Sequence, residues 1–173
     1  MLIDVSFFTS GPRCIENASI ATMPTSQSLS VNEAIEGYIV AFQEEFLYKV
    51  VGAELASALK DYMKLVENDE EKPDSVESPT SIFGLMCRKL REPFADYVFY
   101  HILRDANTQA TMKGLVRLKC SNEYVSPVKR QVSTWNSMVD KIRLFIEWAM
   151  TDECPYKVRI DNNLLTPINF FNL

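Results

Sequence analysis

The stretch LREPFADYVFYHILRD, residues Leu90 to Asp105, decides the fold of this chain. Eight of the ten residues from Phe94 to Leu103 are apolar or aromatic, and only Asp96 and His101 interrupt them. A helix that is apolar around most of its circumference must be covered by other elements on several sides. The stretch is too short to cross a bilayer, which needs about 20 apolar residues. We therefore expect a central core helix over about residues 93–105, with other helices packed around it.

The proline at position 93 leaves the start of this helix open between two alternatives. Pro93 suits the first turn of a helix, where its missing N–H group removes no hydrogen bond. The other alternative is one longer helix that begins at about Thr80 and is kinked at Pro93. The apolar residues between Ile82 and Leu90 fit both, because they form an amphipathic turn or helix that leads into the core helix.

The composition is that of one ordinary globular domain. Of the 173 residues, 47% are hydrophobic and 24% are charged, and this length can bury a sizeable core. The net charge of −5 argues against nucleic-acid binding as the main function. The first residues lack the basic segment of a signal peptide, and no window reaches membrane-spanning length, so we expect neither. We divide the domain into an N-terminal arm (1–29), a helical core (30–154) and a C-terminal tail (155–173).

Two helices are expected directly after the N-terminal arm, whose own first eight residues look strand-like or extended. Ser30 and Glu33 form a capping-box pattern, which predicts a helix start there. Apolar residues then recur at steps of three and four, and Gly52 is a natural C-cap. A second helix carries the apolar residues from Leu55 to Val66. The short break predicts an antiparallel or sharply angled pair.

The second half of the chain alternates between loops, a strand-like region and one more helix. Residues 67–80 contain six acidic residues and two prolines, which predicts a solvated loop. Alternation of apolar and polar residues predicts a short β-hairpin or an extended excursion over about residues 110–124. Ser126-Pro127 then begins a helix with one apolar face, which Cys154-Pro155 closes. The expected fold is mainly α: a small bundle around the central helix, with extended N- and C-terminal arms.

The C-terminal tail ends in apolar residues that require a groove. It includes Phe170 and Phe171 and carries no charged residue after Asp161. Its groove lies either on its own domain or on another subunit, and the sequence favours neither.

Residues with catalytic or metal-binding potential are few. The four cysteines show no C-x-x-C spacing and the chain has a single histidine, so reduced structural thiols are a better interpretation than zinc ligands. His101 lies among apolar residues, where a packed core histidine is more common than a general base. Asp96 precedes Arg104 and Asp105 by eight and nine residues, and we expect an ion pair that closes the helix end. We therefore expect no enzymatic activity, no metal and no cofactor.

A basic surface is the one nucleic-acid feature that the sequence offers. It would consist of Arg117, Lys119, Lys129 and Arg130 together with Tyr124. No recognised nucleic-acid-binding motif accompanies these residues, and the net charge opposes this interpretation.

Several short sequence segments resemble those of a known family of viral proteins. They are Glu44-Glu45-Phe46-Leu47 running through Gly52-Ala53-Glu54-Leu55, the run from Phe94 to Tyr100, and Val125-Ser126-Pro127 with Trp135-Asn136. Together with the order of elements, they resemble the head–tail connector (adaptor) family of tailed phages, in the versions found in prophages of gut bacteria. The resemblance spans roughly residues 30–150 and includes no diagnostic catalytic motif.

The resemblance implies a virion structural protein. Members are all-helical subunits of a ring, often of twelve copies, between the portal protein and a tail-side protein, assembled in the bacterial cytoplasm and located at the head–tail junction. DNA passes through the ring without specific binding, which suits an acidic protein, and no membrane is involved. The alternative is a small soluble binding or regulatory protein of a mobile element without catalytic activity. The candidate contact residues are Leu115, Arg117, Lys119, Tyr124, Phe170 and Phe171.

Overall fold

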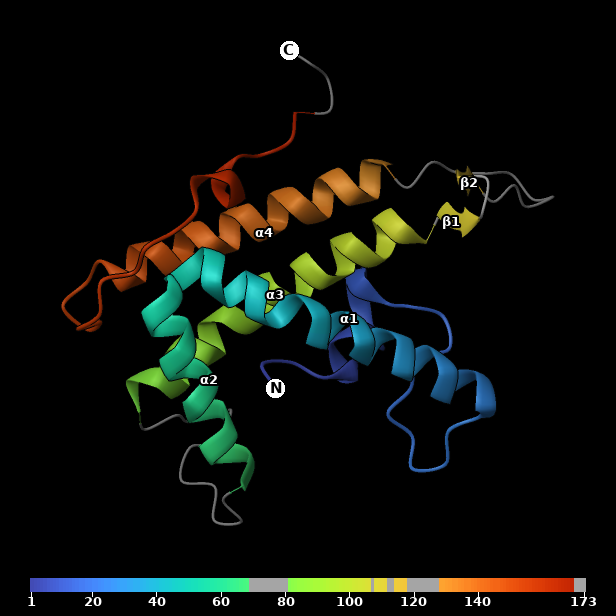
Figure 1. Ribbon diagram of the computed structural model, residues 1–173, viewed down its shortest axis with the longest axis horizontal. Helices are drawn as coiled ribbons and strands as arrows, with labels where there is room; N and C mark the ends of the chain where they lie inside the picture. The colour runs from blue at the N-terminus through green and yellow to red at the C-terminus, as the bar shows by residue number, and fades with distance from the viewer. Residues whose placement is uncertain (69–80, 107, 112–113, 118–127, 170–173) are drawn as a thin grey trace.

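The computed structural model describes residues 1–68, 81–106, 108–111, 114–117 and 128–169, and its described part is mainly α-helical (Figure 1). The expected fold class is therefore confirmed. The α-helices are α1 (Ser26–Val51), α2 (Ala53–Asn68), α3 (Ile82–Asp105) and α4 (Val128–Ala149). α3 runs beside α4, and α1 crosses α3 (Figure 1).

The central helix is the longer of the two alternatives that the sequence allowed. α3 begins at Ile82 and continues through Pro93, and the Ser81 hydroxyl caps its start by accepting a hydrogen bond from the Gly84 N–H. Every residue from Pro93 to Phe99 is buried, as expected for a helix that is covered on several sides. Because neighbouring helices pack against this whole circumference, burial holds the helix together across the proline.

The N-terminal arm differs from its expected extended form. Residues Val5–Phe8 form a 3₁₀ helix (η1), capped by the Asp4 side chain, which accepts a hydrogen bond from the Ser6 N–H. Four apolar side chains of this region are buried in the common core: Leu2, Ile3, Val5 and Phe8. These side chains pack on the helical bundle from a 3₁₀ turn, so the strand-like interpretation of the first eight residues was wrong.

The start of α1 also differs from the prediction, whereas its end agrees. The helix begins at Ser26, because the Thr25 hydroxyl accepts a hydrogen bond from the Ser28 N–H at 3.2 Å. The cap predicted at Ser30 is wrong, since that residue already lies inside the helix. α1 ends before Gly52, whose φ of +85° is a backbone conformation that glycine adopts readily and other residues rarely do. α2 then runs at a sharp angle to α1, as expected (Figure 1).

Replacing Gly52 by alanine is expected to destabilise the protein by about 1–3 kcal/mol, since its backbone conformation strongly favours glycine. An added Cβ would also lie 3.4 Å from the Arg159 Cβ. The matched control is Gly37→Ala, inside α1, where an added Cβ meets nothing within 4 Å. This control should gain roughly 0.5–1 kcal/mol from helix propensity. Urea unfolding measures the free energy of unfolding of both variants. Equal values would contradict the requirement for glycine at position 52.

Of the two alternatives predicted for about residues 110–124, the structure shows the β-hairpin, and its strands lie within residues 108–117. Strands β1 (Thr108–Thr111) and β2 (Gly114–Arg117) pair antiparallel just beyond the end of α3 (Figure 1). Residues 118–127 lie outside the described residues, and so do the predicted helix start at Ser126-Pro127 and residues 69–80 of the acidic loop. Glu67 and Asn68, the first two residues predicted for that loop, instead end α2. α4 stops at Ala149, earlier than the predicted end at Cys154-Pro155.

Candidate functional site

The candidate contact residues fall into two groups. Leu115 and Arg117 belong to β2, where their backbones pair with Ala110 and Thr108 of β1. The other four lie outside the described residues: Lys119, Tyr124, Phe170 and Phe171. The structure thus brings two of the six together on one strand.

The predicted basic surface is altered by the fold at Arg130. Its guanidinium lies 4.8 Å from the centre of the Phe99 ring and donates a hydrogen bond to the Pro12 carbonyl at 2.7 Å. Arg130 therefore fastens the N-terminal arm to the α3–α4 pair, which is a structural role.

A cluster of charged side chains joins the N-terminal arm to α3 and α4. Asp96, which is only 4% exposed, accepts hydrogen bonds from Arg13 Nη1 at 2.8 Å, Lys141 Nζ at 2.7 Å and the Ser137 hydroxyl at 2.9 Å. Glu92, one turn earlier, pairs with the same two cations. Burial alone would raise the pKa of Glu92, but hydrogen bonds and charge from Arg13 and Lys141 hold that pKa below its usual value.

The predicted partner of Asp96 was wrong. Arg104 pairs instead with its neighbour Asp105, at 2.8 Å. The physical reason is distance: eight residues correspond to about 12 Å along a helix, too far for a direct ion pair. Sequence reasoning missed Arg13 and Lys141, because pairs so distant along the chain leave no local pattern.

His101 is enclosed by aromatic rings and is 7% exposed. Its ring stacks on Phe42 at 3.9 Å between centroids and meets the edge of Tyr97 at 4.6 Å. Neither ring nitrogen has a hydrogen-bond partner among the described residues. Burial, assisted by the charge of Arg104, lowers the pKa of His101 to about 4. The histidine is therefore neutral at neutral pH, and without an orienting partner its surroundings favour a packing role over that of a general base.

The described cysteines and carboxylates do not form a reactive or metal-binding cluster. Burial raises the pKa of the Cys87 thiol to about 11, so it is protonated at neutral pH and a poor nucleophile. Cys14, Cys87 and Cys154 are free thiols. Over the described ranges, no group of three or more His, Cys, Asp or Glu side chains could hold a metal ion.

The C-terminal segment, residues 156–169, lies on its own domain. The Asp161 N–H donates to the Lys49 carbonyl at 2.7 Å, and Leu164 is buried. Trp135 Nε1 donates to the Thr166 carbonyl at 2.9 Å. Asn136 exchanges two hydrogen bonds with the backbone of Ile168, at 2.8 and 3.1 Å. For these residues, the first of the two alternatives for the tail is therefore the one observed.

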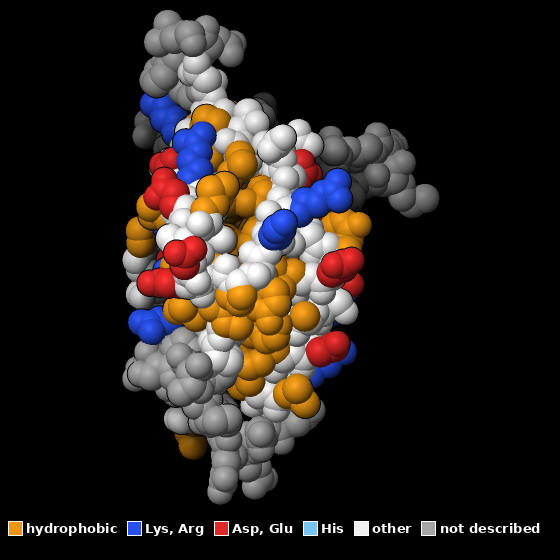
Figure 2. All heavy atoms as spheres, turned by 90° about the vertical axis from the view of Figure 1, so that its left-hand side faces the viewer, with side chains coloured by type: hydrophobic (Ala, Val, Ile, Leu, Met, Phe, Trp, Pro, Cys, Tyr) orange, Lys and Arg blue, Asp and Glu red, His pale blue; other side chains and the backbone are white. Residues whose placement is uncertain are grey.

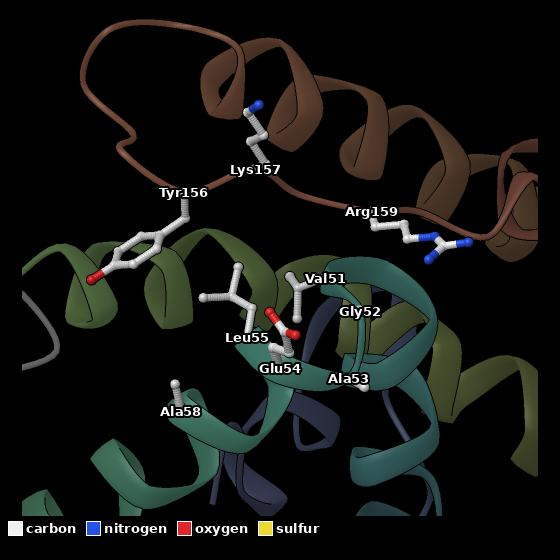
Figure 3. Close-up of a pocket in the computed structure, with 9 residues that line it drawn as sticks. All are labelled: Val51, Gly52, Ala53, Glu54, Leu55, Ala58, Tyr156, Lys157 and Arg159. Carbon is white, nitrogen blue, oxygen red and sulfur yellow. The ribbon is translucent and has the colours of Figure 1, made fainter.

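A groove lies between this segment and the corner where α1 meets α2 (Figure 3). Its volume is about 640 Å³. Val51, Leu55 and Ala58 line it from below, and the Tyr156 ring forms a wall on the other side (Figure 3). The face of the molecule seen in Figure 2 carries apolar side chains gathered at its centre. No local sequence pattern predicts this groove, because its walls come from opposite halves of the chain.

Comparison with family models, curated proteins and solved structures finds no match for this chain. In the part of the chain that the structure describes, no helix has the length and apolar character needed to span a membrane.

Proposed function

We propose that this chain is a virion structural protein of the head–tail connector type, which assembles into a ring between a portal protein and a tail-side protein. The observation that supports this most is an anchored loop with exposed apolar side chains. Ile20 and Met23 of the N-terminal arm are 70% and 92% exposed. Two hydrogen bonds between Ser19 and Asn32, at 2.7 and 3.2 Å, hold this loop against α1. A fixed loop with apolar tips is a suitable docking element for a neighbouring protein.

Ring formation requires a head-to-tail contact between unlike surfaces of neighbouring copies, because such a contact can repeat and close. The anchored loop at one end of α1 would supply one of these surfaces. The exposed carboxylates of α1, Glu33, Glu36 and Glu44, together with the net charge of −5, are suited to a channel wall that does not retain DNA.

Removing this chain from an inducible prophage is expected to leave DNA-filled heads and separate tails, since the joining ring would be absent. Electron microscopy of the induced lysate measures the joined fraction. Complementation with the Ile20→Ser, Met23→Ser double variant should restore few joined particles. The control is Leu144→Ser, which changes an apolar residue of α4 that is 64% exposed and should complement fully. Normal joining of heads and tails without this chain would contradict the proposal. The binding partner of this chain should then be sought among soluble proteins.

A further inference from the structure

We propose that the groove at the α1–α2 corner receives Phe170 and Phe171 from a second copy of this chain. This inference rests on the proposed function in that it names the contact between neighbouring subunits of the ring. Its evidence is the chemistry of the groove and the position at which the C-terminal segment leaves the domain.

The apolar part of the groove is suited to an aromatic occupant. The apolar lining consists of Val51, Leu55, Ala58 and Tyr156. Glu54 and Arg159 also line the groove, and the Lys157 side chain points away from it (Figure 3). Tyr156 is held in place by stacking on Phe83, at 5.1 Å between ring centroids. The volume of about 640 Å³ lies within the roughly 300–1,000 Å³ of pockets that bind ligands.

The C-terminal residues have the matching chemistry. Residues 163–173 include two phenylalanines, three leucines and one isoleucine, and none of them is charged. Each phenylalanine carries roughly 150–250 Å² of surface that is stabilising to bury. A partner of this composition fits the apolar part of the groove at the α1–α2 corner.

The distance from Ile168 to the Tyr156 end of the groove favours an occupant from another copy. Ile168 is fixed to Asn136, next to Trp135, which packs on Tyr100 at 4.9 Å. The groove wall instead stacks on Phe83, which lies 17 residues earlier on α3 and is therefore about 25 Å away along the helix. Phe171 follows Ile168 by three residues and reaches about 10 Å at most.

Such a contact is directional and repeats. Each copy would give its own phenylalanines to one neighbour and receive those of the other, which is the head-to-tail arrangement that closes into rings. A contact made by two aromatic side chains is small, so isolated copies should associate weakly. Ring closure converts the last contact into an intramolecular one and strengthens the whole assembly.

The first test measures binding of a fluorescent peptide with the sequence of residues 167–173 to the purified full chain. Saturable binding is expected, and Ala58→Arg should weaken it at least tenfold by filling the groove. The matched control is Ser57→Arg, at the exposed neighbouring position on α2, which should bind like the unmodified chain. A peptide with both phenylalanines replaced by serine should not bind. Binding that Ala58→Arg does not weaken, or no binding, overturns the proposal.

The second test separates donor from acceptor. A chain lacking residues 170–173 retains only the groove, and the Ala58→Arg chain retains only the phenylalanines. Each alone should sediment as a monomer. Their mixture, at concentrations above the dissociation constant measured with the peptide, should form one-to-one pairs that grow no further. Absence of pairs overturns the proposal, provided that circular dichroism shows both variants folded. Because both tests use isolated protein, peptide binding without incorporation into particles would refute only the phage function, and incorporation without binding would refute only this contact.

Discussion

Replacing Asp96 by alanine is expected to lower the free energy of unfolding by about 3–5 kcal/mol, the cost of removing one partner from a buried ion pair. Its carboxylate accepts hydrogen bonds from Arg13, Lys141 and Ser137. Without it, Arg13 and Lys141 would share only the exposed Glu92 carboxylate, and the Ser137 hydroxyl would lose its acceptor at the interface between the N-terminal arm, α3 and α4. Urea unfolding at neutral pH measures the loss, which is a large part of the stability of a domain of this size.

The control for this variant is Asp140→Ala on α4. Asp140 is 74% exposed and its ion pair with Arg143, at 3.6 Å, lies in solvent. Exposed pairs of this kind contribute about 0–1 kcal/mol. Equal losses for the two alanine variants would show that the Asp96 cluster does not hold the arm to the bundle.

Acid is expected to destabilise the protein through His101 in the pH range between about 6.5 and 4. The pKa of His101 is about 4 in the folded protein, compared with 6.5 for an exposed histidine. Because the unfolded chain binds this proton first, stability is fully present above pH 6.5 and is lost as the pH falls towards 4. The full shift corresponds to about 3 kcal/mol. Urea unfolding at pH 7, 6, 5 and 4.5 measures the decline.

The variant His101→Phe isolates this contribution. It keeps a ring stacked on Phe42 and removes two buried nitrogens that have no hydrogen-bond partner among the described residues. We expect little loss at pH 7 and a much flatter decline below it. The lowered pKa values of Glu45, Glu92 and Asp105 stabilise the fold above their unfolded pKa values, so their contributions are lost mainly below about pH 4.5. Identical pH dependence of variant and unmodified protein would contradict the role assigned to His101.

The sequence predicted those features that depend on local pattern. The apolar circumference of residues 94–103 predicted the central helix, and Gly52 predicted the corner between α1 and α2. Local pattern failed where two nearby signals compete, since Thr25 and Ser30 are both plausible caps and the structure uses the first. It also could not decide the role of Pro93, because burial by other helices keeps α3 continuous there.

The features that carry the candidate site depend on contacts between distant segments. Arg13 meets Asp96 across 83 residues, and the groove combines residues near 55 with residues near 156. No periodicity or motif encodes such pairs, so the sequence alone predicted a C-terminal tail in need of a groove without locating the groove.

The most direct test of the proposed function is quantitative mass spectrometry of phage particles sedimented after prophage induction, with isotope-labelled peptides of this chain as internal standards. A ring at the head–tail junction predicts that the chain sediments with the particles at a fixed number of copies, on the order of a dozen per particle. Particles that form normally and contain none of this chain would contradict the proposal.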